Sequence, residues 1–136
     1  MVTLVFPKTP TNHHYIPLRL YYDAEHYTAS ALYDTGATYC SVPKSINDEI
    51  MHLSVLGQNS DIETARGLAT FDYSTLEKVE ILEYLPLDEP FEGKAITVKN
   101  VKIWICPEND VFTAGANLFL DLQVIKDKQG QLQIND

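Results

Sequence analysis

One aspartate stands where a chain could present an acid to a ligand. Asp34 follows the apolar segment Ala31-Leu32-Tyr33 and precedes Thr35, Gly36 and Ala37. A carboxyl can take up and release a proton, a threonine hydroxyl can anchor a loop, and glycine lets a ligand backbone approach closely. The same residue types are common in ordinary β-turns. The tetrapeptide alone therefore fits both an acid-presenting loop and a turn without chemistry.

A second short pattern follows later in the chain, where the apolar segment Val111–Ala114 ends at Gly115. Taken together, the two patterns resemble the retropepsin-like aspartic proteases. In that family an apolar-apolar-Asp-Thr-Gly-Ala loop carries the catalytic acid, and a later apolar-apolar-Gly before a short helix supports that loop. The order of the predicted elements also matches, and the resemblance spans roughly Tyr15 to Ile134.

The resemblance assigns roles to individual residues. It implies that Asp34 is the catalytic aspartate, that the Thr35 hydroxyl grips the partner loop, and that Gly36 borders the substrate backbone. Gly115 matches the supporting glycine. The resemblance places the substrate-binding wall at Leu32, Ala37, Gly67, Val111 and Thr113.

Some positions depart from the family pattern. Thr38 and Ala116 stand where many retroviral members have an Asp and an Arg that pair near the dimer interface. Since both halves of that pair are missing together, we expect a different interface, resting on Thr35 and on the terminal segments 2–6 or 132–134. The predicted flap also lacks the glycine-rich tip of viral members. Its turn is therefore predicted at one of two positions, Gly67 or residues 72–74.

The chemistry of this family requires two carboxyls that share a proton. The sequence has one Asp-Thr-Gly and is too short for two lobes, so the resemblance implies a homodimer in which each chain gives one Asp34. The predicted function is an aspartic endopeptidase acting on an extended polypeptide, without a cofactor. The alternative is a catalytically silent retropepsin-like dimerisation or peptide-binding module.

The elements that must position these residues are predicted to be mostly strands. Short apolar runs separated by turn residues, rich in Tyr, Val, Ile and Thr, favour an all-β fold. We expect one domain over residues 1–136, a retropepsin-like closed β-barrel or sandwich with a flap hairpin and one or two short helices. The predicted strands and hairpins are 2–6, 15–22, 26–33, a flap within 61–85, 96–106, 111–114, and a hairpin around 127–130. The predicted helices are 45–53, capped by Ser45, and 116–122; 86–93 is a solvated loop and 107–110 a turn.

Composition excludes several other functions. Ten Lys and Arg against nineteen Asp and Glu give a net charge of −9, and the scattered cations argue against a nucleic-acid partner or an anionic membrane. No apolar run approaches the roughly 18 residues of a membrane span, and no leader pattern opens the chain, so we expect a cytoplasmic protein.

The cysteines and histidines predict no metal site. Cys40 and Cys106 lack a C-x-x-C spacing, and His13, His14, His26 and His52 lack a metal-binding spacing. We expect free thiols, with Cys40 a small buried hydrophobe rather than a redox switch, and surface or packing histidines.

Overall fold

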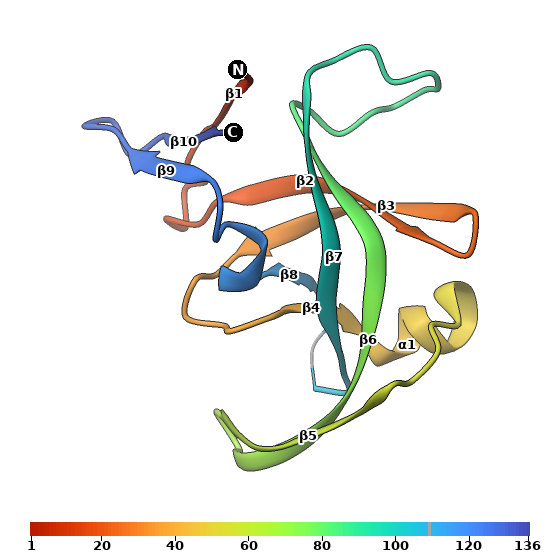
Figure 1. The fold of residues 1–136 in the computed structure, drawn as a ribbon. Coiled ribbons are helices and arrows are strands. Elements are labelled where there is room, and N and C mark those ends of the chain that lie inside the picture. Colours follow the sequence, from red (N-terminus) through yellow and green to blue (C-terminus); the bar gives the residue numbers. More distant parts are fainter. Residues whose placement is uncertain (109) are drawn as a thin grey trace.

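The computed structural model describes every residue except Asn109 (Figure 1). Asn109 belongs to the predicted turn 107–110, which thus lies partly outside the described residues. The strands are β1 (Thr3–Phe6), β2 (Tyr15–Tyr22), β3 (Glu25–Tyr33), β4 (Cys40–Pro43), β5 (Gly57–Thr64), β6 (Gly67–Leu82), β7 (Ala95–Cys106), β8 (Phe112–Ala114), β9 (Gln123–Lys126) and β10 (Leu132–Asn135). The helical segments are α1 (Lys44–Ile46), the π-helical η1 (Asn47–Met51) and the 3₁₀ turn η2 (Ala116–Leu118). The prediction of an all-β fold with little helix is confirmed.

Six strands close into a barrel. Their order is β2-β3-β8-β4-β7-β6, and β6 returns to pair with β2. Strand β5 pairs with the far half of β6, so the β5–β6 hairpin extends away from the barrel (Figure 1). It includes the segment predicted to be a flap and is called the flap hairpin below. The inward-facing side chains form one apolar core, in which Ile16, Leu18, Leu76, Ile81 and Ile103 are fully buried.

The two ends of the chain form a separate small sheet. Strand β10 lies between β1 and β9, with Leu4 opposite Ile134 and Phe6 opposite Leu132. All four of these side chains are buried. Both terminal segments that were predicted to contact a partner thus already pair with each other within one chain, side by side in Figure 1.

The first predicted helix is shifted and irregular. It begins at Lys44 rather than after a Ser45 cap, with Pro43 in the cap position and no side-chain hydrogen bond there. It then widens into a π turn, because the His52 amide donates to the Asn47 carbonyl and the Leu53 amide to Asn47 Oδ1 at 2.9 Å. The buried Asn47 side chain thus replaces the expected regular ending.

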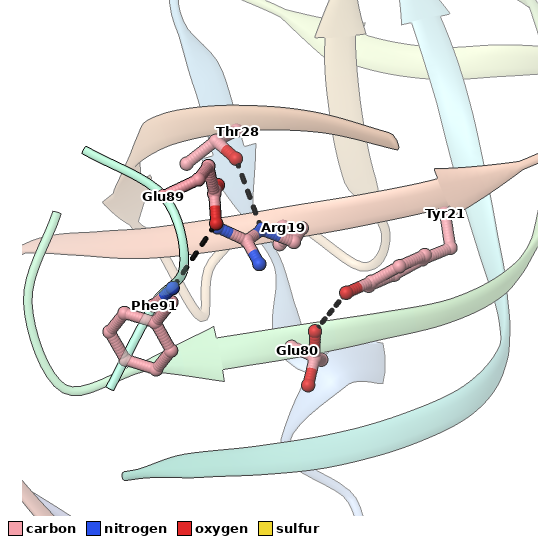
Figure 2. Close-up of polar contacts among 6 residues, drawn as sticks. All are labelled: Arg19, Tyr21, Thr28, Glu80, Glu89 and Phe91. Carbon is pink, nitrogen blue, oxygen red and sulfur yellow. Dashed lines mark hydrogen bonds and ion pairs between the residues drawn. The ribbon is translucent and has the colours of Figure 1, made fainter. Parts of the chain in front are cut away.

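The acidic loop between β6 and β7 is largely exposed, as predicted, but it is also anchored to the barrel. Arg19, buried on β2, donates to Glu89 at 2.6 Å and to Thr28 at 3.3 Å (Figure 2). Glu89 also accepts the backbone amide of Phe91, whose ring lies 5.9 Å from the Arg19 guanidinium. A buried cation needs a partner charge, and the loop provides it.

A neighbouring pair on the same barrel face is also shown in Figure 2, where the Tyr21 hydroxyl donates to Glu80. Burial, together with this hydrogen bond, raises the pKa of the Tyr21 phenol above its ordinary value. The polar side chains of this face are therefore hydrogen-bonded, Arg19 to Glu89 and Thr28 and Tyr21 to Glu80. The face lies at the end of β6 opposite the flap hairpin.

Candidate active site

The Asp34 loop begins where two parallel strands end. Tyr33 of β3 pairs with Ala114 of β8, and the Asp34 amide donates to the Ala114 carbonyl at 3.0 Å. The loop then turns back on itself, because the Ala37 amide donates to the Asp34 carbonyl and the Gly36 amide donates to Asp34 Oδ1 at 3.0 Å. The carboxyl is therefore oriented by its own loop and remains exposed.

Residues 115–117 support this loop from behind. The Ala116 amide donates to the Ala37 carbonyl at 2.8 Å, and the Asn117 amide donates to the Thr38 carbonyl at 3.1 Å. The backbone of Tyr39 passes so close to Gly115 that a Cβ there would lie 2.3 Å from the Tyr39 carbonyl oxygen. Only glycine allows this approach, which is the supporting role that the resemblance implied for Gly115.

Asn117 was missed by the sequence analysis, which placed it in a two-turn helix. Its Oδ1 accepts the Cys40 amide at 2.8 Å, and its Nδ2 donates to the Lys102 carbonyl at 2.8 Å. The side chain thus joins the start of β4, just after the Asp34 loop, to β7, and the helix is limited to the 3₁₀ turn Ala116–Leu118. An asparagine two residues after the supporting glycine was the available signal.

A cleft of about 920 Å³ lies between the Asp34 loop and the flap hairpin. Four predicted site residues line it: Asp34, Gly36, Ala37 and Thr113. The flap hairpin contributes residues 59–66 and Phe71, and the opposite wall includes Tyr39, Ser41 and Trp104.

The other predicted site residues lie outside this cleft wall. Thr35 is exposed beside Asp34, and half-buried Leu32 pairs with Thr113 within the barrel. Val111, 43% exposed, precedes β8. Gly67, with a φ of +107°, closes the flap turn, where the Thr64 hydroxyl donates to the Gly67 carbonyl at 2.8 Å. The turn therefore lies at Gly67, one of the two predicted positions, and 72–74 is within β6.

Trp104 is a second site residue that the sequence patterns did not single out. It is half-buried on β7, lines the cleft, and donates from Nε1 to Asn59 Oδ1 at 2.9 Å. Its ring makes edge contacts with Tyr39 and Phe71, at centroid distances of 5.0 and 5.5 Å.

The charges on the cleft wall are mostly negative. Among the described residues that line it, the acids are Asp34, Asp61, Glu63 and Glu108, and the cation is Arg66 at the flap tip. Both cysteines are free and Cys40 is buried, as predicted, and Cys106 is buried as well. Burial raises the pKa of the Cys40 thiol to about 11. Cys40 is therefore a protonated packing residue at neutral pH.

Among the residues that the structure describes, no three His, Cys, Asp or Glu side chains lie close enough together to hold a metal ion. His14 is buried against the Gly130 carbonyl at 2.7 Å, and His13, His26 and His52 are exposed, in agreement with packing and surface roles. Among the described residues, no helix is long and apolar enough to cross a membrane.

Comparison with known proteins supports the architecture. No protein-family model matches the chain, and neither does any curated protein. Among solved structures, the chain is similar to the crystal structure of a retropepsin-like aspartic protease from Rickettsia conorii, with 19% identity and a TM-score of 0.67. The match covers 98% of this chain and 90% of the other. The chain therefore has the fold of a retropepsin-like aspartic protease.

Proposed function

We propose that the protein is an aspartic endopeptidase that works as a homodimer, each chain giving one Asp34. The observation that carries the proposal is the placement of Asp34. Its exposed carboxyl is held by the Gly36 amide on a supported loop, at the edge of a cleft covered by a hairpin. The similarity in fold to a retropepsin-like aspartic protease supports the same function.

The proposed mechanism needs the second carboxyl because one group cannot act as acid and base in the same step. In the dimer, one carboxylate removes a proton from water while the other, protonated, carboxyl donates to the oxygen of the scissile carbonyl. Two such groups in contact cannot both ionise easily, so the pair holds one proton between them. The exposure of Asp34 and Thr35 in the single chain leaves both free to meet a partner loop.

The first test replaces Asp34 with Asn, which keeps the shape and removes the acid. We expect cleavage of an unfolded substrate such as casein to fall by at least about a hundredfold, the contribution of general acid-base catalysis. Asp23→Asn is the matched control, since Asp23 is an exposed turn residue at the opposite end of β3. Substantial cleavage by Asp34→Asn, with a circular dichroism spectrum like that of the wild type, contradicts the assignment.

The second test addresses the dimer. Specific activity should fall on dilution as chains separate, because each then keeps one carboxyl. Sedimentation measured over the same concentrations should show the dimer dissociating where activity is lost. A rate strictly proportional to protein concentration through dissociation contradicts the shared site. A dimer without any peptidase activity instead supports the silent dimerisation or peptide-binding module.

A further inference from the structure

A β-bulge interrupts the strand pairing of the flap hairpin partway along its length. At its base, Gly57 pairs with Tyr73 and Asn59 pairs with Phe71. The pairing resumes only at Ile62, opposite Ala69, so Ser60 and Asp61 together face Thr70. Asp61 has a φ of +59° at this bulge. The bulge thus divides a base, next to the barrel, from a tip over the cleft.

Trp104 ties this base to the barrel. It lies on β7, opposite Tyr73 of β6. Its indole reaches past β6, and Nε1 donates a hydrogen bond to Asn59 Oδ1 on β5 at 2.9 Å. Phe71, the partner of Asn59, is buried against the same indole at 5.5 Å. The hydrogen bond is therefore a direct side-chain connection across three adjacent strands.

Trp104 also contacts Tyr39, whose backbone packs on the supporting Gly115. The Tyr39 ring lies 5.0 Å from the indole, and the Tyr39 backbone packs on Gly115. Lys102 Nζ lies over the rings of both Tyr39 and Tyr73, at 4.4 and 4.1 Å. One continuous set of contacts thus links the Asp34 loop to the base of the flap hairpin.

We infer that Trp104 is a positioning residue, which fixes the flap base relative to the Asp34 loop through its hydrogen bond to Asn59. Movement of the hairpin is then confined to the tip beyond the bulge, residues 62–69. The consequence for catalysis rests on the proposed function, whereas the connection itself is a property of the single chain.

The test replaces Asn59 with Leu, which has a similar volume and no acceptor. We expect amide hydrogen exchange in peptides covering 57–59 and 71–73 to become about fivefold faster, the factor for one net hydrogen bond. Trp104 is the single tryptophan, so acrylamide quenching of its fluorescence should increase in the same variant. Asn59→Asp keeps an acceptor oxygen and should restore both readouts.

The matched control is Gln58→Ala. Gln58 also bridges β5 and β6, donating to Asp72 at 2.9 Å, but it does not contact Trp104 or line the cleft. Its exchange and quenching should stay near those of the wild type. Unchanged exchange in Asn59→Leu, an equal increase in Gln58→Ala, or no rescue by Asn59→Asp would each overturn the inference.

Kinetics add a readout that depends on the enzyme. If the chain cleaves peptides, Asn59→Leu should lower kcat/KM by about fivefold, and Asn59→Asp should recover it. An unchanged kcat/KM would overturn the catalytic consequence. If the wild type cleaves nothing, the proposed function fails, and the exchange and quenching measurements still decide whether Trp104 anchors the flap base.

Discussion

Gly115 offers the sharpest test of how the Asp34 loop is supported. Its backbone is extended, with φ −88° and ψ 176°, so alanine could adopt the conformation without strain. The obstacle is contact: an added Cβ would lie 2.3 Å from the Tyr39 carbonyl oxygen and 2.9 Å from the Cys40 nitrogen. Ordinary contact begins near 3.4 Å, so the Tyr39 backbone would have to move by roughly 1 Å.

We expect Gly115→Ala to reduce the free energy of unfolding by about 3 kcal/mol, the upper part of the range for overpacking. For a chain of this size, that corresponds to a fall in Tm of about 10 °C. The displaced Tyr39 backbone directly follows Ala37 and Thr38, whose carbonyls accept the supporting Ala116 and Asn117 amides. Because the shift should disturb these hydrogen bonds, peptidase activity should fall by about a hundredfold in molecules that remain folded. Urea denaturation and casein cleavage below the transition measure the two effects separately.

Gly130→Ala is the matched control. Gly130 needs a positive φ of +81°, but an added Cβ there would meet only the flexible Lys8 side chain, at 3.3 Å. We expect a loss of about 1 kcal/mol from backbone conformation alone and no change in activity. If Gly115→Ala were no more destabilising than Gly130→Ala, the close approach at Tyr39 would not be what makes glycine necessary.

Two further predictions concern buried groups. Because burial raises the pKa of the Cys40 thiol from 9.0 to about 11, the thiol ionises at lower pH in the unfolded chain than in the folded protein. The contribution of the buried thiol to the free energy of unfolding should be complete below pH 9 and disappear as pH rises towards 11. Urea denaturation at each pH measures this dependence, which Cys40→Ala should lack. Glu89→Leu leaves the buried Arg19 guanidinium without its carboxylate and should reduce the free energy of unfolding by about 2 kcal/mol. Arg19→Met should cost less, because it leaves only a largely exposed Glu89 without a partner. Equal losses of stability in thermal denaturation would contradict this account.

The sequence predicted the parts of the fold that depend on local patterns. Short apolar runs located most of the strands, but β4 (Cys40–Pro43) was not predicted and β5 begins at Gly57, before the predicted flap segment. The Asp34 loop could be recognised because its chemistry is contained in consecutive residues. The helices were less predictable, because the Asn47 side chain accepts the Leu53 amide and the Asn117 side chain accepts the Cys40 amide of β4, in place of a regular helical pattern. Those partners are distant in sequence or set by tertiary packing, so helical periodicity alone did not reveal them.

The missed cleft residues have a different physical reason. Trp104 and Asn59 meet across the intervening strand β6, and their contact depends on the register of two ladders and on the bulge after Asn59. A single sequence does not specify register to one residue. An aromatic residue in a strand pattern is most simply explained by core packing, so the sequence pattern did not indicate that Trp104 lines the cleft or donates a hydrogen bond to Asn59.

The small terminal sheet changes how the proposed dimer should be studied. Leu4 and Phe6 pair with Ile134 and Leu132 inside one chain and belong to its core. Removing either terminal segment would therefore destabilise the protomer itself, so weaker association after trimming would not identify an interface. The sheet could offer a partner only its outward face, where Val5 and Ile125 are exposed, or its edge strands. Substitution of Val5 by a charged residue leaves the core intact, and its effect on dissociation tests this face directly.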